Sequence, residues 1–415
     1  MDLTIHQNCP SCGAGIILQE ADRLIRCPFC EVQNFMVTRG ALRFVFPDKA
    51  PRHIRREDLF FAPYLRFKGN VFYCKGQQVK YKVVDTTRQG MKGAPLPLSL
   101  GLRPQAMPVA LVTNEVAGHF LPQTMKAKTL LEQAARLTEL DSGKKKTPLY
   151  HRAYIGETLS CIYLPLYVDK GVLYDAVINT RLGVGGSEED LKTHSVRFKN
   201  IWTPHFLSTR CPHCAAALSG ERDSLILTCS NCQSVWEEKQ SSFKKIQWSS
   251  VATAFDAMYH LPFWRLSVHV SGVEMETFAD LLQATNQPLV IQKRHKNRSL
   301  AFWLPAFKIR PSTFLRLGKN LSLSQEKISA GRQELPKKMH PVTLPRKEAV
   351  QALKSILAAM ALNKKRFFSK LPAIGFRPLQ TELVYLPFHD KGYDFVQEQT
   401  GISLAQSVLH FGRKL

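Results

Sequence analysis

Eight of the ten cysteines stand in pairs of the form Cys-x-x-Cys, a spacing that lets two neighbouring thiolates bind the same metal ion. The pairs come in two sets, and 14 residues separate the two pairs within each set. Four thiolates complete a tetrahedron around Zn²⁺ and leave no position for a water molecule. We therefore predict two structural zinc ions per chain, held by Cys9, Cys12, Cys27 and Cys30, and by Cys211, Cys214, Cys229 and Cys232.

Iron is the alternative metal, because a rubredoxin-type site also has four cysteines. Rubredoxins usually space their cysteine pairs more widely, which favours zinc. Cys74 and Cys161 have no partner at ligand spacing and are expected to be strand residues. Residues 1–10 carry no secretion signal, and no apolar run approaches the roughly 18 residues of a membrane span. We therefore expect a cytoplasmic protein, whose thiols stay reduced.

Further landmarks follow each cysteine set in the same order, which indicates an internal duplication. An aromatic-proline segment occurs first at 60–66 and then at 259–265. The other pairs are Leu-Pro followed by Arg-Pro at 96–104 and 304–311, and Tyr-Leu-Pro followed by Asp-Lys-Gly at 163–171 and 385–392. The offset between the copies grows from about 200 to about 220 positions, as small insertions in the second copy would produce.

Hydrophobic patterns predict one long helix and several strands in each copy. Val350, Leu353, Leu357 and Met360 form one apolar stripe, which predicts a helix over 345–362. A similar pattern predicts its counterpart over 124–140. Strands are expected in the segments rich in β-branched and aromatic residues, at 71–74, 79–84, 109–113, 172–178, 264–270 and 301–304.

The predicted fold class is therefore α+β, with two tandem copies of one module. Each copy is expected to contain a four-cysteine zinc ribbon followed by a mostly antiparallel sheet with one main amphipathic helix. The expected divisions are ribbon 1 at residues 1–40, the first α+β domain at 41–205, ribbon 2 at 206–240 and the second α+β domain at 241–415.

The formal net charge of +24 implies attraction to something anionic, such as nucleic acid, an anionic membrane surface or an acidic protein. Basic residues beside aromatic rings are what phosphate neutralisation and base stacking would use. Candidate nucleic-acid or anion-binding residues in such runs are Lys244, Lys245, Lys293, Arg294, Lys296, Arg298, Lys364, Lys365 and Arg366. Solvated loops are the alternative interpretation of each run.

Signatures of catalysis are missing from the sequence: it contains no HExxH, no GxSxG and no GxxxxGK[ST] phosphate loop. Residues 183–186 are glycine-rich, but the acidic residues that follow them are unsuited to binding phosphate. We therefore expect a loop at 183–186. Asp169 and Asp390 each precede Lys-Gly and are expected in turns, with a paired-carboxylate site as the alternative. His213 lies inside a cysteine pair and is expected to point away from the metal. We therefore predict that the protein is not an enzyme.

The cysteine pairs resemble those of the zinc-ribbon superfamily, which includes the ribbon of general transcription factor IIB. With the aromatic-Leu-Pro-aromatic segments, clearest at 260–264, the chain also looks like a loose group of bacterial ribbon proteins of unassigned function. Some of these have been labelled primosomal helicase-like or transcription-factor-like. The ribbon match covers about a tenth of the chain. The resemblance implies a zinc-binding protein of the bacterial cytosol, but it implies no molecular activity.

Two functions are compatible with these features. The first is a zinc-binding adaptor in which two ribbon modules form a platform for protein partners, because the chain is duplicated without catalytic residues. The alternative is a nucleic-acid-binding protein that uses the basic runs and the ribbons. The sequence suggests no small-molecule substrate.

Overall fold

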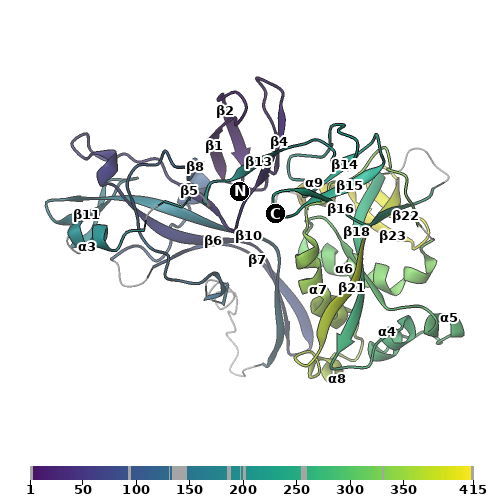
Figure 1. The fold of residues 1–415 in the computed structure, drawn as a ribbon. Coiled ribbons are helices and arrows are strands. Elements are labelled where there is room, and N and C mark those ends of the chain that lie inside the picture. The colour runs from purple at the N-terminus through teal and green to yellow at the C-terminus, as the bar shows by residue number, and fades with distance from the viewer. Residues whose placement is uncertain are drawn as a thin grey trace. The chain divides into compact units, whose positions relative to one another are not determined.

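Figure 1 shows the fold in a computed structural model that describes residues 3–91, 95–129, 131–132, 147–184, 188–196, 198–199, 202–253, 259–329 and 331–412. The chain divides into two compact units. Unit 1 comprises Met1–Lys68, Val84–Asp141 and Glu157–Thr209, and unit 2 comprises Gly69–Val83, Ser142–Gly156 and Arg210–Leu415. In the described part of the chain, no helix is both long and apolar enough to cross a membrane.

The main sheet of unit 1 has ten strands, and its strands β6, β7 and β10 continue into residues assigned to unit 2. Its order is β12-β11-β10-β5-β8-β1-β2, while β6 pairs with β10, β7 and β9. The strands are β1 (Thr4–Asn8), β2 (Gly15–Gln19), β5 (Leu42–Val45), β6 (Phe60–Lys75), β7 (Gln78–Gln89), β8 (Val109–Leu111), β9 (His119–Phe120), β10 (Leu149–Asp169), β11 (Val172–Asp175) and β12 (Thr180–Val184).

This sheet combines antiparallel pairings with parallel pairings that were not predicted. The hairpins are antiparallel, but β1 pairs in parallel with β8, β5 with β10, and β6 with β9. Sequence patterns show where strands lie but not which strands become neighbours. Short helical segments connect the strands: η1 (Arg56–Asp58), α1 (Arg103–Ala106) and α3 (Glu188–Thr193).

A smaller antiparallel sheet in unit 1 carries the second cysteine pair of ribbon 1. It consists of β3 (Leu24–Arg26), β4 (Gln33–Val37) and β13 (His205–Ser208). The strand β13 pairs with β4 from His205 opposite Val37 to Ser208 opposite Asn34. The chain segment just before ribbon 2 is therefore hydrogen-bonded to ribbon 1.

Unit 2 contains a ribbon sheet and a seven-stranded sheet, both mainly antiparallel. The seven-stranded sheet has the order β19-β18-β21-β17-β20, with β22 and β23 continuing from β21. The strands are β14 (Ile226–Cys229), β15 (Ser234–Glu238), β16 (Phe243–Lys245), β17 (Trp248–Val251), β18 (Tyr259–Ser271), β19 (Ala301–Pro305), β20 (Gly331–Arg332), β21 (Gly375–Asp390), β22 (Asp394–Gln397) and β23 (Ile402–Ala405).

The helix predicted over 345–362 is confirmed as α7 (Arg346–Met360), with Leu353, Leu357 and Met360 fully buried. A second long helix, α6 (Pro311–Leu323), was not predicted, so one main helix per copy was an incomplete description of unit 2. The remaining helices are α4 (Phe278–Ala284), α5 (Lys293–Lys296), η3 (Gln325–Lys327), α8 (Lys364–Phe368) and α9 (Gln406–Gly412).

Unit 2 also incorporates the distant segments 69–83 and 142–156, which we call the arm. Phe72 of the arm packs against Phe314 of α6, with ring centroids 6.0 Å apart. The amide of Gly156 donates a hydrogen bond to the buried carboxylate of Glu348 on α7. The core of unit 2 is therefore built from three separate stretches of sequence.

The coarse fold prediction is confirmed, because the described chain is a strand-rich mixture of helices and strands. Strands lie at each of the six predicted segments, and Cys74 on β6 and Cys161 on β10 are buried. Of the helix predicted over 124–140, residues 130 and 133–140 lie outside the described residues, as do residues 185 and 186 of the glycine-rich loop predicted at 183–186. The Asp390 carboxylate accepts a hydrogen bond of 2.8 Å from the Gly392 amide, which is the predicted turn role.

Candidate metal centres

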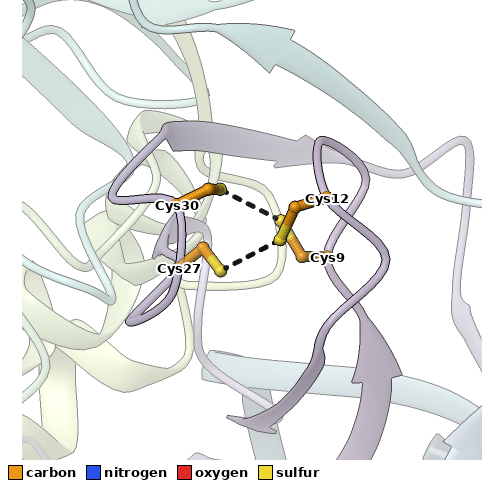
Figure 2. A group of neighbouring side chains, drawn as sticks. All are labelled: Cys9, Cys12, Cys27 and Cys30. Carbon is orange, nitrogen blue, oxygen red and sulfur yellow. Dashed lines mark hydrogen bonds between the residues drawn. The ribbon is translucent and has the colours of Figure 1, made fainter.

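The four cysteines of ribbon 1 converge from two loops, as Figure 2 shows. Cys9 and Cys12 follow β1, whereas Cys27 and Cys30 lie between β3 and β4. The Sγ atoms of Cys9 and Cys30 are 3.8 Å apart, and those of Cys12 and Cys27 are 3.7 Å apart. All four sulfurs lie within 4.8 Å of one another.

The four cysteines predicted as ligands in ribbon 2 form a similar cluster. The Sγ atoms of Cys211 and Cys232 are 3.6 Å apart, and those of Cys214 and Cys229 are 3.5 Å apart. These four sulfurs also lie within 4.8 Å of one another. Among the described residues, the two cysteine clusters are the only groups of three or more side chains placed to share a metal ion.

The sulfur spacing fits a tetrahedral metal site in both ribbons. With metal–sulfur bonds of about 2.3 Å, the edges of a regular tetrahedron of sulfurs are about 3.8 Å long. A disulfide would bring two sulfurs to about 2.05 Å, and all eight cysteines are free. Each cluster can therefore hold one metal ion through four sulfur ligands.

Each cysteine pair sits on a tight turn whose last residue adopts the left-handed backbone conformation. Gly13 has φ +77°, and its amide donates a hydrogen bond of 2.9 Å to the Cys9 carbonyl. Ala215 has φ 59°, and its amide donates a hydrogen bond of 2.9 Å to the Cys211 carbonyl. The other two turns place Glu31 (φ 58°) and Gln233 (φ 51°) in the same conformation. Sequence reasoning missed this shared feature, although each of the four residues directly follows the second cysteine of its pair.

These turns aim backbone amides at the sulfurs. The amides of Ser11 and Phe29 each lie 3.4 Å from a sulfur, those of Cys9 and Cys27 respectively. Burial raises the pKa of the Cys9 thiol, but hydrogen bonds from the Ser11 and Cys12 amides outweigh this and lower it to about 6. Amide donors of this kind stabilise the thiolate form that a metal requires.

Ribbon 2 adds side-chain donors that sequence reasoning missed. The Asn231 side chain hydrogen-bonds to Cys214 and, with the Ala216 amide, lowers the pKa of that thiol to about 6. The Ser234 hydroxyl lies 2.9 Å from the Cys232 sulfur and accepts a 2.7 Å hydrogen bond from the Trp236 indole. A polar residue two positions after the second pair is a signal that could have suggested such a contact. His213 is exposed beside its cluster.

The predicted anion-binding residues lie on three different elements of unit 2. Lys244 and Lys245 are exposed on β16, but the neighbouring Trp248 is 3% exposed. On α8, Lys364, Lys365 and Arg366 precede the buried rings of Phe367 and Phe368. These rings are not available for base stacking, which the sequence interpretation had assumed.

The basic run at α5 is partly neutralised within unit 2. Arg294 forms an ion pair of 3.3 Å with Glu326, and Arg298 donates a 2.7 Å hydrogen bond to the Gln325 carbonyl. Lys293 and Lys296 are exposed. Two of the four basic side chains in this run are therefore engaged within the fold.

The chain matches no protein-family model, no curated protein and no solved structure.

Proposed function

We propose that both clusters hold structural Zn²⁺ and that the protein is a non-enzymatic adaptor whose ribbon 1 docks a protein partner. Zinc is supported by the closed set of four thiolates and by the two tight turns in each ribbon. A closed tetrahedron has no open position at which to activate water, so the metal stabilises the ribbon fold. The free thiols are compatible with a reducing compartment such as the cytosol.

The proposal includes a duplicated module, and matching backbone hydrogen bonds support it. The carbonyl of Pro63 accepts a 2.7 Å hydrogen bond from the Gly90 amide in unit 1. The carbonyl of Pro262 accepts a 3.0 Å hydrogen bond from the Ala306 amide in unit 2. Pro63 and Pro262 are landmarks that the sequence pairs, and they make the same contact in each unit. Because Ala306 corresponds to Gly90 in this comparison, Pro305 corresponds to Gln89, and the sequence pairing of Leu96-Pro97 with Leu304-Pro305 is not supported.

The same correspondence extends to the chain that leads into each long predicted helix. The Gly90 carbonyl accepts hydrogen bonds from two consecutive amides, at residues 124 and 125, at 3.0 and 2.9 Å. The Ala306 carbonyl accepts from the amides at 343 and 344, both at 3.0 Å. Strand neighbours also correspond, since β5 pairs with β8 and with β10 as β17 pairs with β20 and with β21. Independent origins would not be expected to reproduce this order.

The observation that carries the adaptor proposal is the apolar exterior of ribbon 1. Phe29, inside the second cysteine pair, is 70% exposed, Ile17 is 64% exposed and Val32 is 44% exposed. The corresponding positions of ribbon 2 are polar: Ser219, Asn231 and Ser234. An exposed aromatic ring on a metal-braced turn is pre-organised to enter an apolar pocket of a partner, as interface anchors do.

Affinity capture with variants tests the adaptor proposal. Phe29→Ser should abolish capture of a specific protein partner, and nuclease treatment should leave capture by the wild type unchanged. The matched control is Tyr393→Ser, because Tyr393 is 92% exposed but lies outside the ribbons. Capture that survives Phe29→Ser, or that disappears with nuclease, would contradict the proposal.

Nucleic-acid binding is the second candidate, supported by the net charge of +24 and by the exposed Lys244, Lys245, Lys293 and Lys296. Its affinity must fall steeply with salt, with a log–log slope of about −0.9 per phosphate contact on duplex DNA. We expect weak binding that ignores sequence and vanishes near physiological ionic strength. Tight binding at physiological salt, lost when these four lysines are replaced by alanine, would make nucleic acid the principal partner.

A further inference from the structure

Unit 1 contains a cavity of about 380 Å³ at one end of strands β5 and β8. Its walls come from β1, from the residues that follow β5, from the start of β6 and from residues 108–110 and 115–117. This volume lies within the range of small-molecule sites, about 300–1,000 Å³. Neither cysteine cluster contributes a residue to it.

The floor of the cavity is apolar and the rim is charged. Val45, Phe46, Leu59, Phe61 and Val109 line the floor and are each at most 7% exposed. The ionisable lining residues are His6, Asp48, Arg56 and Glu115. Asp48 is half-buried and the other three are exposed. Apolar walls with a few converging polar groups are characteristic of ligand sites.

Glycine at position 118 lets the wall at 115–117 lie close to β6. Gly118 has φ +122°, and a Cβ atom there would lie 2.7 Å from the Leu59 carbonyl oxygen and from the Phe61 ring. The adjacent His119 amide donates a 2.8 Å hydrogen bond to that same carbonyl. Glu115 is therefore carried by a backbone segment that is tied to the floor of the cavity.

The charge of the rim is opposite to that of the chain. Basic residues outnumber acidic residues by 57 to 33 overall, yet two carboxylates and one guanidinium line this cavity. In the described part of the chain, the side chains of Asp48, Glu115 and Arg56 form no ion pair with one another or with other groups. Both carboxylates are therefore available to a ligand.

We infer that this cavity binds a small organic cation with an apolar body, such as a hydrophobic primary amine. The apolar floor takes the body of the ligand, and Asp48 and Glu115 receive the ammonium group. Arg56 lies on the same rim and disfavours a second positive charge, so a monocation is the expected class. The inference is independent of the adaptor proposal, because it uses no residue of either metal centre.

Three probes with the same phenyl body test the inference: phenethylamine, 2-phenylethanol and 3-phenylpropionate, titrated against the full chain by ligand-observed NMR and calorimetry. A ligand of about ten heavy atoms should bind in the millimolar range. The amine should bind best, the alcohol more weakly and the carboxylate least. Equal affinities, tightest binding of the carboxylate, or no binding of any probe would overturn the inference.

Variants locate the binding. Asp48→Asn and Glu115→Gln should each weaken binding of the amine about two- to fivefold, as expected for exposed ion pairs. Both variants should leave the affinity for the alcohol unchanged. Ala117→Phe, at an exposed lining position, should block both probes. The control is Glu57→Gln, which removes an exposed carboxylate beside Arg56 that does not line the cavity. Amine binding that is unaffected by Ala117→Phe, or weakened equally by Glu57→Gln, would contradict the assignment.

Discussion

Ribbons 1 and 2 build nearly the same cysteine cluster, and both pack apolar residues into the core of their unit, but ribbon 1 is held by a buried ionic network as well. In ribbon 1, the fully buried Arg66 of β6 pairs with the buried Glu20 just after β2 and with Asp85 at 2.9 Å. Ser160 of β10 donates a 2.9 Å hydrogen bond to the same Glu20. A buried ionic network thus connects ribbon 1 to its sheet.

Ribbon 2 is anchored by apolar packing and backbone hydrogen bonds. Ile226 and Val235 belong to the main hydrophobic core of unit 2. The Leu225 amide donates a hydrogen bond of 2.8 Å to the Val342 carbonyl. The proposed duplication pairs Arg66 with Arg265, whose side chain is 48% exposed and forms an ion pair of 3.2 Å with Glu382. The comparison teaches that cysteine spacing determines the cluster, whereas residues outside the pairs determine what each ribbon contacts.

Loss of a cysteine should have the largest effect. Cys9→Ser and Cys211→Ser should each remove one of two metal ions and unfold one ribbon, because zinc binding contributes about 10 kcal/mol or more to the folding of such sites. Elemental analysis with thermal unfolding checks this. Retention of both metals, or loss of both in either variant, would show that the ribbons are not two separate sites.

The anchoring arginines should differ clearly in their effect on stability. Arg66→Ala leaves the buried Glu20 carboxylate uncompensated and should lower the free energy of unfolding by about 3–5 kcal/mol. Arg265→Ala removes a partly exposed ion pair and should cost less than about 1 kcal/mol. Urea unfolding of both variants measures the difference. Equal losses would contradict the contrast between a buried and a surface anchor.

The smallest effect concerns the second cysteine pair of each ribbon. Asn231→Ala removes a hydrogen bond to Cys214 and should weaken metal retention about tenfold, at the low end for such supporting residues. Phe29→Ala, at the corresponding position, should leave retention unchanged because the ring is exposed. Competition with a chromogenic chelator measures both. A loss of similar size in the two variants would remove the proposed division between a metal-supporting and a partner-facing residue.

Local sequence was sufficient for the cysteine clusters and for α7, because both follow from short-range spacing. It was insufficient for α6, whose sequence includes Pro311, Ser312, Thr313 and Gly318 and has weak helix propensity. Tertiary packing compensates: a Cβ at Gly318 would lie 2.6 Å from the Ile356 side chain, so glycine lets α6 approach α7 closely. Such an approach leaves no periodic signal in the sequence.

The arm and the cavity were also beyond local reasoning. The strand β6 is continuous, yet its residues from Gly69 onward belong to unit 2, and no change in its pattern marks that point. Likewise, His6, Asp48 and Glu115 are far apart in sequence and resemble ordinary surface residues. The fold alone brings them to one rim.

The identity and coordination of the metal test the central claim most directly. X-ray absorption at the zinc edge, combined with elemental analysis of the purified protein, should show two zinc ions per chain, each with four sulfur neighbours at about 2.3 Å. Iron in place of zinc, fewer than two metal ions, or nitrogen or oxygen atoms in the first coordination shell would contradict the account.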